Sequence, residues 1–151
     1  MADQEPQFNI PEPVRAATPD AVQAHLDHEI KEHIRSYEAR SKSEISARIR
    51  ELDREWDIER VLELNASSLA LTGTVLAAAV NKRWLALPAV VLTFLVQHAI
   101  QGWCPPIPLF RRMGVRSRKE IDLEKYALKV LRGDFGNARS DADGALDSAG
   151  N

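Results

Sequence analysis

Residues 66–103 read ASSLALTGTVLAAAVNKRWLALPAVVLTFLVQHAIQGW, and the part from Trp84 to Trp103 runs twenty residues without a formal charge. A helix of twenty residues is about 30 Å long, which is the thickness of the hydrocarbon core of a bilayer. In hydrocarbon, only a helix or a closed barrel satisfies the backbone hydrogen-bonding groups. The stretch therefore predicts an all-α protein built on a two-helix transmembrane hairpin, with arms at about 64–80 and 84–103 joined at Asn81-Lys82-Arg83.

The average composition hides this organisation. The 151 residues are 44% hydrophobic and 28% charged, with a formal net charge of −2. Nearly all of the charged residues lie outside 66–103, so the polar and apolar parts cannot share one globular core. The length suits one domain, and we expect one membrane element with polar flanks. With Cys104 as the single cysteine, an intramolecular disulfide is excluded.

The N-terminal flank divides near Thr18. Residues 1–17 carry Pro6, Pro11 and Pro13 among polar residues and are expected to be disordered. Thr18 is a candidate N-cap for a long amphipathic cytoplasmic helix over 18–63. Ser41-Lys42-Ser43 interrupts its apolar stripe, so one helix and two helices both remain open. The stripe recurs in steps of three and four at Val22, Leu26, Ile30, Ile34, Tyr37, Ile45, Ile49, Leu52 and Trp56.

This stripe needs a partner, and three interpretations compete. The first is a self-associating coiled coil or an intramolecular helix pair. The second is a helix on the membrane surface, which the excess of acids over 20–64 disfavours because such helices usually present a basic face. The third is a helix over residues 20–60 that folds on another protein. His25 and His28 lack a third ligand in register, so we expect no metal site.

The first arm is short and rich in small residues. Its sixteen or seventeen residues span only about 25 Å. Small residues four apart let helix backbones approach closely in lipid. The pattern predicts packing against the second arm or against the same arm of a homodimer partner. The predicted packing residues are Ala66, Ala70, Gly73, Thr74, Ala77 and Ala78.

Polar residues interrupt the far end of the second arm. Gln97, His98 and Gln101 fall there, and Cys104 follows directly after Trp103. Polar groups at membrane depth are candidates for function, although hydrogen bonds to a neighbouring helix or to headgroups explain them equally. Cys104 is a candidate thiol only if its pKa is lowered and a base lies near it.

Basic residues predict the orientation of the hairpin. The loop holds only Lys82 and Arg83, whereas nine Lys and Arg flank the two arms. The positive-inside rule then predicts that both termini lie in the cytoplasm and that the protein is a multi-pass membrane protein. Five of the flanking residues are expected to contact phospholipid headgroups, and nucleic acid is not expected as a partner. They are Arg111, Arg112, Arg116, Arg118 and Lys119.

Proline dominates the segment after the second arm. Pro105, Pro106 and Pro108 predict an extended, basic juxtamembrane segment over 104–116. Ser117 and Glu120 match a capping box that opens a short cytoplasmic helix over 117–133. The tail over 134–151 has almost nothing to bury and is expected to be disordered.

The stretch Gly102-Trp-Cys-Pro-Pro-Ile-Pro-Leu-Phe-Arg-Arg-Met-Gly114 resembles the YgaP-like inner-membrane transmembrane domain family of bacteria. The resemblance covers about residues 54–115. It includes the two-arm hairpin and the run Arg54-Glu-Trp-Asp-Ile-Glu-Arg-Val-Leu-Glu. The family is named for a member whose hairpin follows a sulfur-transferring rhodanese domain. No such domain and no matching catalytic cysteine exist here, so only Cys104 carries over. The resemblance implies a membrane-embedded, dimeric helix pair of a stand-alone branch, with no assigned chemistry.

No catalytic constellation is apparent, so we expect neither an enzyme nor a cofactor. The favoured function is a membrane anchor or assembly module that uses its long N-terminal helix for interaction. One alternative is thiol-dependent handling or transport of reactive sulfur through Cys104. Another is a soluble helical bundle whose core is formed by the apolar arms.

Overall fold

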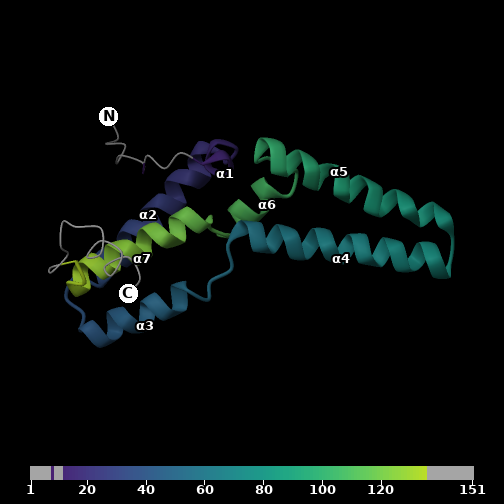
Figure 1. Ribbon diagram of the computed structural model, residues 1–151. Helices are drawn as coiled ribbons and strands as arrows, with labels where there is room; N and C mark the ends of the chain where they lie inside the picture. Colours follow the sequence, from purple (N-terminus) through teal and green to yellow (C-terminus); the bar gives the residue numbers. More distant parts are fainter. Residues whose placement is uncertain (1–7, 9–11, 136–151) are drawn as a thin grey trace, which may run out of the picture. The chain divides into compact units, whose positions relative to one another are not determined.

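The computed structural model describes residues 8 and 12–135, and every regular element in that part of the chain is a helix (Figure 1). The all-α prediction is confirmed. The described residues form two compact units, one within 1–26 and 56–118, the other within 27–55 and 119–151. The disorder predicted for 1–7, 9–11 and 136–151 falls outside the described residues.

The first apolar helix, α4 (Ile58–Ala79), starts earlier than predicted. The Asp57 side chain accepts a hydrogen bond of 2.9 Å from the backbone N–H of Arg60, and Glu59 lies in the first turn. The carboxylates of Asp57 and Glu59 both suit the positive end of the helix dipole. The predicted boundary between a first helix ending at 63 and an arm starting at 64 was wrong, because Asp57 caps a single helix whose first residue lies six positions before 64.

The second apolar helix follows a tight turn. Asn81 accepts a hydrogen bond from the backbone N–H of Arg83, a short 3₁₀ helix η1 covers Lys82–Leu85, and α5 covers Ala86–Gln101. Gly102 ends α5 with a φ of 66°, the left-handed conformation that favours glycine. The segments Ile58–Ala79 and Lys82–Gln101 are each long and apolar enough to cross a membrane.

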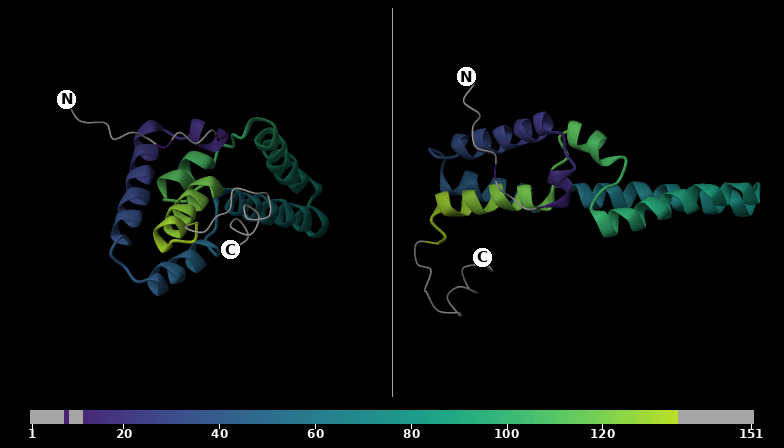
Figure 2. Two further views of the ribbon diagram at one scale, coloured as in Figure 1. Left: turned by 60° about the vertical axis from the view of Figure 1, so that its left-hand side comes forward. Right: turned by 90° about the horizontal axis from the view of Figure 1, so that it is seen from above.

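Helices α4 and α5 lie side by side and run in opposite directions (Figure 1; Figure 2). Gly73 is buried at their contact. A Cβ built on Gly73 would lie 2.5 Å from Cδ of Pro88 and 3.1 Å from Cβ of Leu87. The absence of a side chain at Gly73 therefore sets how closely the two helices approach.

The prolines after α5 do not keep the chain extended. Helix α6 (Ile107–Arg112) forms directly after Pro106, with Pro108 in its first turn. The extended segment predicted over 104–116 was wrong for these six residues. The physical reason is that the first helical turn needs no N–H from proline, and the fixed φ of proline suits a helix start.

Residues 12–17 are also ordered, contrary to the predicted disorder. A short helix α1 (Pro13–Ala16) buries Val14 in an apolar cluster with Ile58, Leu62, Cys104 and Ile107. Gly102 must be glycine for a second reason, since an added Cβ would lie 2.1 Å from Cβ of Pro13. Apolar contact with α4 and α6 orders these residues.

Helix α2 covers Asp20–Ser36 and begins one residue later than a Thr18 N-cap requires. The Thr18 hydroxyl instead donates to the carbonyl of Val14 at 2.7 Å. The N-cap assignment of Thr18 was therefore wrong.

In the second unit, α3 (Lys42–Leu52) and α7 (Arg118–Arg132) both contribute side chains to one apolar cluster. Ser41 and Glu44 form a capping box that starts α3, so the single long helix over 18–63 is replaced by separate helices. The apolar stripe of α3 packs within the chain, as the intramolecular helix-pair interpretation expected. The buried cluster comprises Ile45, Ile49, Leu52, Ile121 and Leu128, with Tyr37 packed against it.

Candidate functional site

An apolar pocket of about 220 Å³ opens in the first unit, where the end of α5 and the segment leading to α6 meet α4. Its wall contains three side chains with polar atoms, Asn65, His98 and Cys104. The other lining residues are apolar: Leu62, Ala66, Leu69, Val91, Phe94, Leu95, Pro105, Pro106 and Phe110. The pocket brings together two predicted candidates, His98 and Cys104, which are six residues apart in sequence.

The polar atoms of the pocket wall differ in their partners. Nδ1 of His98 is buried and has no hydrogen-bond partner among the described residues. The Asn65 side-chain amide donates to the carbonyl of Val61 at 2.8 Å, one turn back in α4. Buried polar atoms are nearly always hydrogen-bonded, so the lone ring nitrogen is the most unusual group of the pocket.

Cys104 is not arranged as a nucleophile. It is 8% exposed, and burial raises the pKa of its thiol above the ordinary value. The thiolate is the reactive form, and an apolar environment disfavours it. Proximity to His98 on one pocket wall therefore does not by itself make an activated cysteine.

The remaining polar residues of α5 pair with each other. The Gln97 side-chain amide donates to the Gln101 carbonyl oxygen at 3.5 Å, one helical turn away. Gln101 is exposed, whereas Gln97 is half-buried. Neither lines the pocket, so His98 alone of the three predicted polar residues belongs to it.

Two of the five residues predicted to contact headgroups are buried instead. Arg111 is 1% exposed, and its guanidinium donates to Gln23 Oε1 at 2.9 Å and to Thr18 Oγ1 and the Val115 carbonyl at 3.1 Å each. Arg116 is also buried. The lipid-contact prediction was wrong for both, because both side chains are buried, and neutral acceptors of the same unit satisfy the N–H donors of Arg111. Arg112, Arg118 and Lys119 are exposed.

The predicted packing residues separate into three groups. Gly73 alone is buried, at the contact with α5. Ala66, Ala70 and Thr74 line a shallow hollow between α4 and α5, where the Thr74 hydroxyl donates to the Ala70 carbonyl at 2.8 Å. Ala77 is half-buried and Ala78 is exposed. Close packing against the second arm is thus centred on Gly73.

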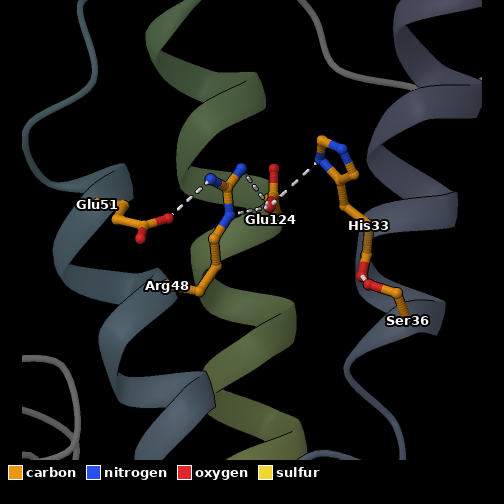
Figure 3. Close-up of polar contacts among 5 residues, drawn as sticks. All are labelled: His33, Ser36, Arg48, Glu51 and Glu124. Carbon is orange, nitrogen blue, oxygen red and sulfur yellow. Dashed lines mark hydrogen bonds and ion pairs between the residues drawn. The ribbon is translucent and has the colours of Figure 1, made fainter.

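The second unit contains a buried carboxylate that sequence reasoning missed. Glu124 of α7 is fully buried, and Arg48 of α3 donates to its Oε1 through Nε and Nη2, both at 3.0 Å (Figure 3). His33 Nδ1 lies 3.8 Å from the same oxygen, and Glu51 contacts Arg48 at 3.2 Å. Glu124 falls among the apolar positions of α7, which was the available signal. The cluster brings together side chains from α2, α3 and α7.

Among residues 8 and 12–135, no three His, Cys, Asp or Glu side chains gather closely enough to hold a metal ion.

Comparison of the chain with protein-family models, with curated proteins and with solved structures finds no match. The function must therefore be argued from the residues and their geometry.

Proposed function

We propose that this chain is a small bacterial inner-membrane protein whose helices α4 and α5 cross the bilayer as a hairpin and anchor its polar helices in the cytoplasm. The observation that carries the proposal is the exposure of apolar side chains along both helices. Only 11% of the apolar window of α4 and 6% of that of η1 and α5 is buried within the structure. Helices of this composition in a soluble bundle would form its core.

The exposed side chains are large and numerous. Burying one Leu, Val or Ile side chain is worth about 1.5–3 kcal/mol relative to leaving it in water. A soluble protein would forgo that stabilisation at each position, whereas hydrocarbon supplies it. The exposed residues are Leu64, Leu69, Leu71, Val75, Val80, Leu85, Val90, Leu92, Phe94, Val96 and Ile100.

The helix lengths agree with a bilayer. The 22 residues of α4 give about 33 Å and the 20 residues of Lys82–Gln101 give about 30 Å, close to a hydrocarbon core of about 30 Å. Polar residues Glu59, Arg60 and Glu63 occupy the first turns of α4, so its apolar part is shorter than the helix. Those turns would lie at the cytoplasmic interface.

The function that follows is anchoring and assembly. By the positive-inside rule, the basic flanks favour a cytoplasmic position for both termini. The exposed Arg112, Arg118 and Lys119 suit anionic headgroups. The apolar stripe of residues 20–60 is largely buried within the chain, so a contact with a protein partner through this segment would use its exposed polar faces. A homodimer is expected, as in the YgaP-like family that the hairpin resembles.

Membrane fractionation tests the proposal. The chain should remain in the pellet after alkaline carbonate and dissolve only in detergent. In a Cys104→Ala background, Lys82→Cys in the loop should react with an impermeant maleimide from the periplasmic side, whereas Lys119→Cys should react only after lysis. Complete carbonate extraction as a monodisperse species would establish the soluble-bundle alternative instead.

One observation favours the sulfur-handling alternative, namely that His98 and Cys104 line the same pocket. Its test is Cys104→Ser. Unchanged tolerance of sulfide and thiocyanate, together with unchanged partner binding, would refute a role of the thiol.

A further inference from the structure

Helix α6 has a buried side and an exposed side. Ile107 and Arg111 are buried, whereas Leu109 is 59% exposed. Met113, directly after the helix, is 70% exposed. At 3.6 residues per turn, Leu109, Met113 and the exposed Arg112 fall within one sector of about 100°, on the side away from the buried residues. These three residues form the outer face of α6, which is apolar with one basic residue at its edge.

The contacts of α6 within the first unit set the depth of this face. The helix lies between the end of α5 and the start of α4 (Figure 1). Ile107 packs in one cluster with Ile58 and Leu62, which lie in the first two turns of α4. In the proposed hairpin these turns lie at the cytoplasmic interface, because they also carry Glu59 and Glu63. The outer face of α6 is therefore at the depth of the boundary between headgroups and acyl chains.

The sequence around α6 suits a membrane interface. Only residues 102–106 separate α5 from α6, and they include the exposed Trp103. Tryptophan is enriched at membrane interfaces. Every charged residue from 102 to 119 is basic. Such a segment offers apolar side chains to the acyl boundary and positive charge to anionic headgroups.

We propose that the outer face of α6 docks onto the cytoplasmic surface of a phospholipid bilayer, with Leu109 and Met113 at the acyl boundary and the Arg112 guanidinium at anionic headgroups. This inference rests on the proposed hairpin and extends it, because the chain then turns along the membrane after α5 instead of leaving it. Lipid removes from water the apolar surface that the protein leaves exposed, which favours the docked state. The membrane contact then comprises the hairpin and this interfacial helix.

Depth-dependent quenching of a fluorescent label tests the docking. Met113→Cys, Leu92→Cys and Glu51→Cys are made separately in a Cys104→Ala background and labelled with the fluorophore NBD. The full-length chain is placed in nanodiscs of phosphatidylcholine and phosphatidylglycerol. Leu92 is exposed on α5, nine residues before its end, and provides the hydrocarbon reference. Glu51 is exposed on α3 and provides the aqueous reference.

We expect phospholipids with a nitroxide near the headgroup end of the acyl chain to quench the label at Met113→Cys. A nitroxide near the end of the acyl chain should quench this label less, and aqueous iodide should quench it much less than the label at Glu51→Cys. Iodide quenching equal to that at Glu51→Cys would place the outer face in water and overturn the proposal. Protection from both iodide and nitroxide would show that a protein surface covers the face, and would overturn it as well.

A charge introduced on the outer face provides a matched test. Leu109→Asp, with the label at Met113→Cys, should increase iodide quenching severalfold, because a carboxylate loses hydration in lipid and is repelled by anionic headgroups. Residue 109 lies in the first turn of α6, where an acid suits the helix dipole, so α6 should persist. Val130→Asp, at an apolar residue of α7 that is 61% exposed, should leave the quenching unchanged. Equal responses to the two substitutions would contradict the docking.

The label at Leu92→Cys separates this inference from the proposed function. Nitroxide quenching at Leu92→Cys without nitroxide quenching at Met113→Cys would refute the docking of α6 and leave the hairpin supported. Iodide quenching at Leu92→Cys as strong as at Glu51→Cys would refute the hairpin itself.

Discussion

Substitution of Gly73 should show whether the contact between α4 and α5 is as close in the membrane as in the structure. An added Cβ would lie 2.5 Å from Cδ of Pro88, a ring atom that cannot rotate away. Carbon atoms prefer a separation of about 3.5–4.0 Å, so Gly73→Ala requires the helices to move apart by roughly 1 Å.

The expected change in stability on Gly73→Ala is opposite in sign to the change that helix propensity alone would give. Replacing Gly by Ala in a helix interior normally stabilises by about 1 kcal/mol. Overpacking of a close contact costs about 1–3 kcal/mol. We therefore expect Gly73→Ala to destabilise the helix pair by about 1 kcal/mol net. Gly73→Leu, with a larger side chain at the same contact, should destabilise it by about 2–3 kcal/mol.

Cys104 supplies the assay without a further mutation. It is the only cysteine and is buried in a cluster with Ile58 and Leu62 of α4, so separation of α4 from this cluster exposes it. A brief maleimide pulse at increasing fractions of SDS in mixed micelles reports the fraction of open molecules. About 1 kcal/mol corresponds to roughly a fivefold change in the opening equilibrium.

The control is Thr72→Leu, which adds apolar volume at an exposed neighbouring position of α4. It should leave the SDS midpoint nearly unchanged. A stabilised Gly73→Ala variant, or Gly73→Leu with the wild-type midpoint, would refute the close contact between the helices.

Three other predictions concern ionisable groups. Burial raises the pKa of the Cys104 thiol, so its reaction with maleimide in the folded chain should titrate at a higher pH than that of an exposed cysteine. The folded chain should lose stability as the pH rises through that range, because the unfolded chain releases the thiol proton first. An ordinary titration midpoint would contradict the burial. Glu124→Gln removes the carboxylate that Arg48 contacts and should lower the free energy of unfolding by about 3–5 kcal/mol, measured by urea unfolding followed by circular dichroism. Glu51→Gln, at a carboxylate that is 67% exposed, should change it by less than about 1 kcal/mol. Similar effects of the two substitutions would argue against a buried pair. Hydrogen bonds from Ser41 lower the pKa of Glu44, so the stability that this carboxylate contributes should be lost as the pH falls below the usual Glu range. Ser41→Ala should raise the titration midpoint of Glu44 measured by NMR. An unshifted midpoint in the wild type would contradict the capping box.

Local patterns predicted individual elements where the cause was local. The hydrophobic stretch of 66–103 predicted two apolar helices with a turn near Asn81, and both are present because helix formation depends on neighbouring residues. The start of α4 was misplaced because the apolar stripe was followed up to Trp56 and the first helix was continued beyond it, although Asp57 followed by Glu59 is a helix-start signal. The prolines near α6 were read as helix breakers, whereas their position decides whether they break or begin a helix.

The candidate pocket was only half predictable. His98 and Cys104 stood out by residue type, but their meeting on one wall depends on α6 and on the turn at Gly102. Asn65 had no signal in the sequence. Likewise, nothing in the basic run after α5 distinguished Arg111, which is buried, from Arg112, which is exposed.

The sequence by itself determined that two apolar helices follow each other and that the charges lie on either side of them, because hydropathy and helix length are properties of contiguous residues. Only the tertiary structure decided which charges are internal and which small residue sets the helix contact. Arg111 is buried because Thr18 and Gln23 lie against it from a segment some 90 residues away. Gly73 sets the helix contact because Pro88 faces it from α5. Such pairings depend on long-range packing, which no local pattern encodes.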